Sequence, residues 1–308
     1  MASGNHPLHP RDWVLLIALS ILWGGSFFCV GVALKELPPF TIVFCRAAIA
    51  AAVLLPAVLL RGIPMPRRIV GWWPFVGMAC LNFVVPFSCL VVGQTFISTG
   101  LASVLNATTP LFTVVVMAAA GEERLTARRV IGVSVGIFGV AILRGVDLRE
   151  AQTGIGVGLC LLAALSYGLS ALLARRQLVG FTPLTTATSQ MVAAAIITGV
   201  IAASVDQPWR LLAPSWPVIV AVVALGTLST ALGYVLFFRI VARSGSTNVM
   251  LVTLLIPLTA ILLGTVVLRE AIGAWELIGA GVIASALLII DGRVLAWLEP
   301  RRWRSERS

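Results

Sequence analysis

The most informative residue of this sequence is an arginine, Arg46, that lies inside an otherwise apolar segment. If that segment crosses a membrane as a helix from residue 39, Arg46 lies about 10 Å below the outer surface. A charge at such a depth usually faces a cavity or a partner, so Arg46 is a candidate to attract a substrate carboxylate or to pair with Glu270. The competing interpretation is that its long side chain reaches outward to the lipid headgroups.

A second group of candidates consists of polar and aromatic residues in the middle of apolar segments. Aromatic faces with scattered amides and hydroxyls suit a small amphiphile such as an amino acid. Each of these residues alone could equally be an interhelical hydrogen bond worth about 1 kcal/mol, or a packing residue. The candidates for substrate binding besides Arg46 are Trp23, Asn82, Phe83, Phe87, Asn106, Tyr167, Ser170, Gln190 and Tyr234, with Ser229 and Thr230 in the same layers.

Two prolines and two glutamates are candidates for gating. Pro110 and Pro257 lie inside apolar segments, where proline removes a backbone hydrogen bond and kinks the helix. The kinks either shape a cavity and bend during gating or are static features of membrane helices. Glu123 and Glu270 follow the same two segments, at opposite faces of the membrane. They either close gates with arginines or form surface ion pairs.

The residues that other kinds of chemistry need are missing from the apolar segments. The only lysine, Lys35, lies in a loop, so no phosphate-binding lysine of an ATPase is present. His6 and His9 precede the first segment, which excludes a histidine relay or metal site within the membrane. No carboxylate lies at the middle of a segment, which favours facilitated transport over proton or sodium coupling. We therefore expect no enzyme, no cofactor, no metal and no ATPase subunit.

The composition shows which elements must position these residues. Of the 308 residues, 59% are hydrophobic and 11% are charged, whereas soluble domains average about 45–50% and about 25%. Charge-free runs long enough to cross a bilayer recur along the chain, and because they are apolar on every face they predict helices, not barrel strands. The ten predicted spans are 13–34, 39–60, 70–92, 99–120, 128–144, 154–174, 183–204, 215–238, 246–268 and 274–296.

The basic residues are distributed as the positive-inside rule requires. With a cytoplasmic N-terminus, 16 lysines and arginines fall on the cytoplasmic side and 5 on the outer side. The net charge of +10 is therefore explained by topology and lipid headgroups, and not by nucleic acid. We predict a bacterial inner-membrane protein with both termini in the cytoplasm.

The two halves of the chain resemble each other. Because each half would contain five spans, an odd number, the second would enter the membrane inverted. The predicted units are a first five-helix repeat at 1–146, a second at 147–297 and a basic tail at 298–308. At an offset of 144, Trp23-Gly24-Gly25-Ser26 falls on Tyr167-Gly168-Leu169-Ser170, Pro39 on Pro183 and Arg46 on Gln190; at 147, Pro110 falls on Pro257, Glu123 on Glu270 and Gly132 on Gly279.

These motifs resemble the drug/metabolite transporter superfamily, and within it the ten-helix EamA-type transporters. The resemblance covers essentially the whole chain and is strongest for the bacterial YddG-type amino-acid exporters. It implies a carrier with a substrate site between the two repeats. The residues that carry the resemblance are Trp23-Gly24-Gly25-Ser26-Phe27, Arg46, Ala231-Leu232-Gly233-Tyr234, Pro257 with Glu270 thirteen residues later, and Gly279.

The expected function is export of amino acids, including aromatic ones, and related metabolites by alternating access. Another cargo within the same superfamily remains an alternative, either a nucleotide sugar, which would need further basic residues in the cavity, or a drug-like cation, which would need a carboxylate. The alternative from another class is a membrane-embedded enzyme. It would require a nucleophile with a base, paired aspartates or metal ligands inside the membrane, and the sequence has none.

Overall fold

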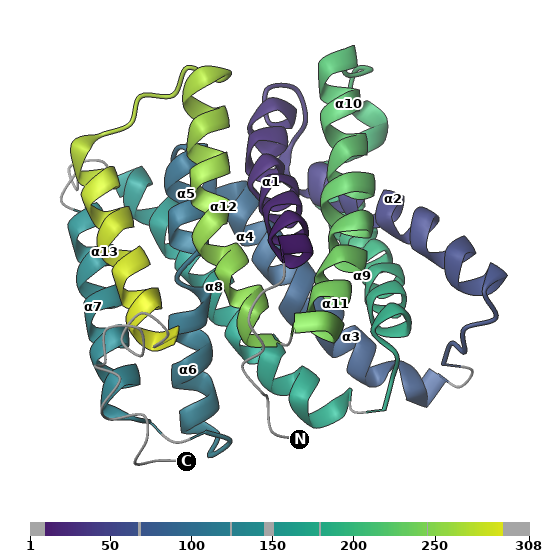
Figure 1. The fold of residues 1–308 in the computed structure, drawn as a ribbon. Coiled ribbons are helices and arrows are strands. Elements are labelled where there is room, and N and C mark those ends of the chain that lie inside the picture. Colours follow the sequence, from purple (N-terminus) through teal and green to yellow (C-terminus); the bar gives the residue numbers. More distant parts are fainter. Residues whose placement is uncertain are drawn as a thin grey trace.

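The computed structural model describes residues 10–66, 69–123, 125–144, 151–178, 180–244 and 246–291, and every regular element in them is a helix. The helices cross one bundle ten times (Figure 1). In chain order the elements are α1 (Pro10–Ala33), α2 (Pro39–Leu60), η1 (Ile69–Trp72), α3 (Trp73–Ala79), η2 (Cys80–Val84), α4 (Val85–Gly93), α5 (Thr99–Asn106), α6 (Thr109–Ala119), α7 (Ala127–Arg144), α8 (Ala151–Gln177), α9 (Pro183–Val205), η3 (Pro208–Arg210), α10 (Trp216–Ala224), η4 (Leu225–Leu232), α11 (Gly233–Ser244), α12 (Ser246–Val266) and α13 (Ala274–Asp291).

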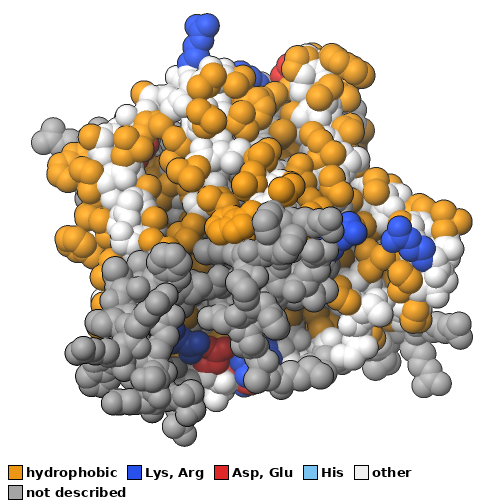
Figure 2. Space-filling model, viewed as in Figure 1, with side chains coloured by type: hydrophobic (Ala, Val, Ile, Leu, Met, Phe, Trp, Pro, Cys, Tyr) orange, Lys and Arg blue, Asp and Glu red, His pale blue; other side chains and the backbone are white. Residues whose placement is uncertain are grey.

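The lengths and surfaces of these helices suit a bilayer. Seven helical segments of 21 to 26 residues are apolar enough to cross it, and shorter apolar helices cover Val252–Val266 and Ala274–Ile290. A crossing helix needs about 20 apolar residues. On the face shown in Figure 2, hydrophobic side chains are spread over the described surface and charged ones are few, where a soluble protein would present charges. The chain is therefore an all-α, multi-pass membrane protein, as the composition predicts.

Local sequence signals set where the helices begin. Proline occupies the first turn of α2 and of α9, where its missing N–H costs nothing. Ser98 accepts a hydrogen bond from the backbone N–H of Leu101 at the start of α5, and Thr182 accepts one from that of Thr185 at the start of α9. These side chains satisfy N–H groups that have no partner within the helix.

Three of the predicted spans are interrupted, and the sequence analysis anticipated only the break at Pro110. The span predicted at 99–120 consists of two helices, because Pro110 cannot donate a backbone hydrogen bond. The carbonyl of Asn106, one turn earlier, accepts a hydrogen bond from the Thr109 hydroxyl at 2.7 Å. Pro257, in contrast, lies inside the continuous helix α12. The matched prolines therefore have different local consequences.

The other two interruptions are π-helices, η2 and η4. At the end of η2 the N–H of Val85 donates to the carbonyl of Cys80, five residues earlier. At the end of η4 the N–H of Gly233 donates to the carbonyl of Leu228, also five residues earlier. The two segments begin 145 residues apart, close to the offsets of the predicted repeat. Single π-turns inside α-helices are often found at functional sites. Both η2 and η4 contain candidate residues, as described below.

Glycines allow the closest helix contacts. A Cβ at Gly132 or Gly139 of α7 would clash with Ile290 or Ile283 of α13, which lies beside α7 (Figure 1). A Cβ at Gly24 of α1 would lie 2.7 Å from the carbonyl oxygen of Ile256 in α12. Small residues at helix interfaces let backbones approach in this way where lipid supplies no hydrophobic drive.

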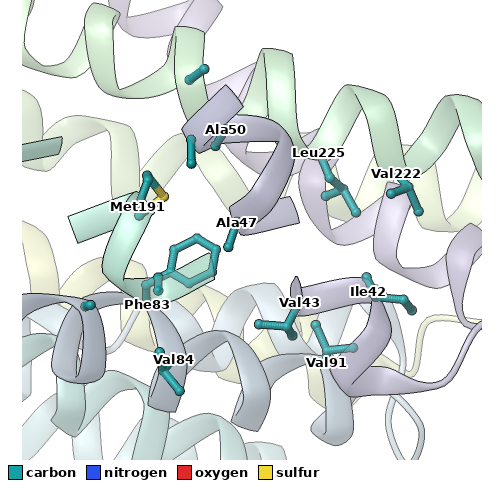
Figure 3. Packing of buried hydrophobic residues seen from close by; sticks show 14 of the residues in the cluster. Ile42, Val43, Ala47, Ala50, Phe83, Val84, Val91, Met191, Val222 and Leu225 are labelled. Atoms are coloured by element: carbon teal, nitrogen blue, oxygen red, sulfur yellow. The ribbon is translucent and has the colours of Figure 1, made fainter. Parts of the chain in front are cut away.

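The core beside the candidate site is apolar and well packed. α2 packs against α9 and η4, and Figure 3 shows the Phe83 ring lying between Met191 and Ala47. Phe83, Met191 and Ala47 are each fully buried. This packing holds α2, which carries Arg46, against α9 and η4, which carry other candidate residues.

Candidate functional site

Arg46 is buried in the middle of the bundle, with 4% of its surface exposed. Its Nε donates a hydrogen bond to the hydroxyl of Thr230 at 2.8 Å, and its Nη1 donates to the hydroxyl of Ser26 at 3.4 Å. Its guanidinium carbon lies 3.9 Å from the centre of the Phe87 ring, a cation–π contact. We call Ser26, Arg46, Phe87 and Thr230 the Arg46 cluster.

This geometry corrects two of the three interpretations of Arg46. The side chain does not reach out to lipid headgroups, because it is buried and bonded within the bundle. It does not pair with Glu270 either, since that carboxylate accepts a hydrogen bond from the backbone N–H of Thr99 at 3.2 Å. Among the described residues, no ion pair includes Arg46. The partners of this buried charge are all neutral.

The position of Arg46 depends on a close approach between α2 and η4. A Cβ at Gly226 of η4 would lie 2.5 Å from the Ile49 side chain and 3.2 Å from the Arg46 carbonyl oxygen. Only glycine therefore lets η4 come near enough for Thr230 to meet the guanidinium. The Thr230 hydroxyl also donates to the carbonyl of Leu225, five residues earlier, so its oxygen is oriented as an acceptor towards Arg46.

A second cluster, the Gln190 cluster, consists of Asn82, Ser170, Gln190 and Tyr234. Gln190 donates from Nε2 to the Tyr234 hydroxyl at 2.8 Å. Asn82, which lies in η2, donates from Nδ2 to the same hydroxyl at 3.1 Å and to Gln190 Oε1 at 3.4 Å. The Ser170 hydroxyl donates to Asn82 Oδ1 at 3.3 Å. Four predicted site residues from four different helical passages thus form one neutral network.

Three residues of the Arg46 cluster match residues of the Gln190 cluster at the offsets of the predicted repeat. Ser26 and Arg46 lie 144 residues before Ser170 and Gln190, and Phe87 lies 147 residues before Tyr234. In each cluster the polar residue of α2 or α9 reaches across to the π-helix of the other half. Arg46 bonds to Thr230 in η4, and Gln190 bonds to Asn82 in η2. The structure therefore brings eight residues into two matched sets.

Aromatic rings lie beside both clusters. The centres of the Phe83 and Phe87 rings are 4.6 Å apart, and the Tyr167 ring meets Phe87 edge-on at 6.2 Å. Trp23 of α1 contacts η4, where its ring nitrogen donates to the Ser229 carbonyl at 3.1 Å. The predicted aromatic residues are therefore near the clusters, and Trp23 also joins α1 to η4.

Asn106, Glu123 and Glu270 make no hydrogen bond or ion pair with either cluster in the described part of the chain. Asn106 ends α5, and its side-chain oxygen is buried without a hydrogen-bond partner. Glu270 binds the start of α5, whereas Glu123 pairs with Arg129 at 2.7 Å and Arg175 at 3.3 Å. The two glutamates thus lie at helix ends, and none of their contacts reaches Arg46.

Two carboxylates that the sequence analysis did not single out bind helix starts at the end of the bundle where α1 finishes. Asp206 accepts hydrogen bonds from the backbone N–H and hydroxyl of Thr41 at 2.6 and 3.0 Å. Glu36 accepts two from Ser215, and these bonds hold the pKa of the Glu36 carboxyl below its ordinary value. At the other end, a hydrogen bond from Arg176 lowers the pKa of Glu122. Each of these partners lies more than fifty residues away, so no local pattern could identify them.

Comparison with known families identifies transporters. The sequence model of the EamA-like transporter family matches residues 12–145 and again residues 154–291. An uncharacterized transporter of Archaeoglobus fulgidus is 23% identical to this chain, and the match covers 91% of this chain and 98% of that transporter. A protein of Escherichia coli K12 described as a "probable amino-acid metabolite efflux pump" is 23% identical over 91% of this chain and 94% of its own.

A solved crystal structure has the same fold. It superimposes with a TM-score of 0.67, covering 95% of this chain and all of the other, at 18% sequence identity. At that identity the likeness concerns the arrangement of helices only. The arrangement in Figure 1 is therefore one that an experimentally determined protein also adopts.

Proposed function

The chain belongs to the EamA-like transporter family, and we propose that it exports small amphiphilic carboxylates, among them aromatic and other amino acids and related metabolites. The carrier lies in the bacterial inner membrane with both termini in the cytoplasm, as the excess of basic residues on one side indicates. Transport follows the substrate gradient. The finer resemblance to the YddG-type amino-acid exporters is part of this proposal, and so is the division into units 1–146, 147–297 and 298–308.

The observation that carries the proposal is the buried charge of Arg46 with neutral partners only. A buried cation is costly unless an anion pairs with it. A substrate carboxylate supplies that anion, and the guanidinium fork matches its two oxygens. The aromatic residues Phe83, Phe87 and Tyr167 would then contact the apolar part of the substrate. The name of the Escherichia coli relative agrees with this substrate class.

Alternating access is supported by the match between the two clusters. If the five helices of the second half are inverted relative to the first, the site lies at the pseudo-twofold axis between them. Either half can then rock against the other and expose the site to one side. Pro110 and Pro257 would be the bending points, and Glu123 and Glu270 would belong to the closures at the two ends. Each acidic residue is engaged with another helix or loop here.

The test is counterflow in proteoliposomes that contain the purified protein and unlabelled phenylalanine, threonine or methionine, without an ion gradient. We expect labelled amino acid to accumulate with the unaltered protein and not with Arg46→Ala. Arg61→Ala is the matched control, because Arg61 lies at the exposed end of the same helix. Failure of all three amino acids with folded protein contradicts the amino-acid assignment. Accumulation that survives Arg46→Ala contradicts the role of Arg46.

The direction of transport needs a measurement in cells. Cells preloaded with labelled phenylalanine should lose the label faster when they express the protein than when they express Arg46→Ala. Equal loss contradicts export and leaves the counterflow result unaffected.

A further inference from the structure

We propose that the site selects its cargo by the carboxylate alone, so that monocarboxylates without an ammonium group, such as aromatic 2-hydroxy and 2-oxo acids, bind better than the amino acids of the same shape. This inference rests on the proposed function, because it names the substrate class of the same site. The selection depends on the net charge of the cargo, which is minus one for a monocarboxylate and zero for a zwitterionic amino acid.

The first argument is the charge of the site itself. Arg46 contributes one positive charge, and the hydroxyls of Ser26 and Thr230 contribute none. A monocarboxylate brings the charge of the occupied site to zero, whereas a zwitterionic amino acid leaves it at plus one. An uncompensated charge is penalised most where water is excluded. The neutral complex is therefore favoured.

The second argument is where the acidic side chains lie. In the part of the chain that the structure describes, every Asp and Glu residue lies in a loop or within a turn of a helix end. Those whose contacts the structure describes are already engaged. Asp206, Glu36 and Glu270 accept backbone N–H groups, and Glu122 and Glu123 pair with arginines. The described carboxylates thus lie at the ends of helices, away from a substrate ammonium beside Arg46.

The third argument concerns the aromatic face and the amides that could replace a carboxylate. An ammonium can bind an aromatic face, but the guanidinium of Arg46 already lies over the ring of Phe87. The Gln190 cluster offers both donors and acceptors, since Gln190 and Asn82 carry amides and Tyr234 a hydroxyl. Such groups accept a substrate hydroxyl or carbonyl as readily as an amine. The second cluster therefore adds hydrogen bonds without adding a preference for the ammonium.

The experiment compares three ligands that share a benzyl group. Binding of 3-phenyllactate, L-phenylalanine and phenethylamine to the purified full chain in nanodiscs is measured by calorimetry at pH 7.4. We expect phenyllactate to bind at least threefold more tightly than phenylalanine, and phenethylamine at least tenfold more weakly. Phenylalanine binding more tightly than phenyllactate, or phenethylamine binding as tightly, overturns the proposal. This comparison needs no variant, so it does not depend on how a variant folds.

Variants and transport then separate this inference from the proposed function. In Arg46→Gln the three affinities should converge, whereas Arg61→Gln should keep their order. If phenyllactate binds through Arg46 but neither it nor phenylalanine gives counterflow, the carrier function is wrong and the selectivity stands. If phenylalanine gives Arg46-dependent counterflow that phenyllactate does not inhibit, the function stands and the selectivity is wrong.

Discussion

The Arg46 cluster and the Gln190 cluster occupy corresponding positions in the two parts of the chain, but one is built around a charge and the other around a neutral amide. In the first, Arg46 of α2 bonds to Thr230 of η4. In the second, Gln190 of α9 bonds to Asn82 of η2. The amide is satisfied within its own network, where Tyr234 and Asn82 bond to Gln190. The guanidinium has neutral partners only. The two clusters thus hold polar groups in similar settings, and only Arg46 is a charge without an anionic partner among the described residues.

The strongest test of this comparison exchanges the two central residues. Arg46→Gln should reduce counterflow at least about 30-fold, because loss of one partner of a buried charge pair costs about 2–5 kcal/mol. The double variant Arg46→Gln with Gln190→Arg should recover part of the activity, since the cation returns at the corresponding position. Counterflow rates at equal amounts of folded protein are the measurement. A double variant as inactive as the single one shows that the two clusters are not interchangeable.

A second test concerns the frame that holds Arg46. Gly226→Ala places a methyl group 2.5 Å from Ile49, so α2 and η4 must separate. Overpacking of this kind costs about 1–3 kcal/mol, which should lower the melting temperature by several degrees. Gly281→Ala is the matched control, because no atom lies within 4 Å of the added Cβ there. A Gly226→Ala protein that melts like the unaltered one means that η4 is not held against α2 by this glycine.

The sequence is sufficient to predict an all-α fold of apolar spans and to single out Arg46 as a charge inside one of them. Hydrophobic runs and residue offsets are local or periodic signals, and they survive in a single sequence. It is not sufficient to choose between the three interpretations of Arg46, because the deciding partner, Thr230, is 184 residues away. A contact of that kind depends on how helices pack and not on spacing along the chain.

The interrupted helices show the same limit. Pro110 and Pro257 match in sequence, yet only Pro110 divides its span, where Thr109 satisfies the exposed carbonyl of Asn106. Pro86 lies just after η2 and cannot donate a backbone hydrogen bond to the carbonyl one turn earlier, whereas no proline lies in or directly after η4, so the two π-helices share no common sequence signal. Their positions follow from the packing of η2 and η4 against neighbouring helices.

A third test compares the aromatic member of each cluster. Phe87→Leu removes the ring beneath Arg46, a contact worth about 1–2 kcal/mol, and should raise the KM for phenylalanine about 5- to 30-fold. Tyr234→Phe keeps the ring but removes the hydroxyl that Gln190 and Asn82 share, and should raise KM only about fivefold. Phe138→Leu, on the exposed face of α7, should change nothing. A larger effect of Tyr234→Phe would place the principal binding contacts in the Gln190 cluster instead.

The smallest effect is expected where a charge lies at the edge of the bundle instead of its centre. Glu36 accepts two hydrogen bonds from Ser215, and because they lower its pKa in the folded state, ionised Glu36 stabilises the fold above its ordinary pKa of 4.5. Glu36→Gln keeps an acceptor for Ser215 and removes the charge, so it should melt slightly below the unaltered protein at pH 7. That gap should begin to close as the pH falls below 4.5, and it should vanish once the pH is below the lowered pKa of folded Glu36, where the glutamate is protonated in both states. A gap that stays constant below pH 4.5 would assign the effect to altered hydrogen bonding, whereas closure of the gap assigns it to the charge. Counterflow at pH 7 should be the same in both proteins, because this carboxylate binds the start of a helix and has no part in the site proposed around Arg46.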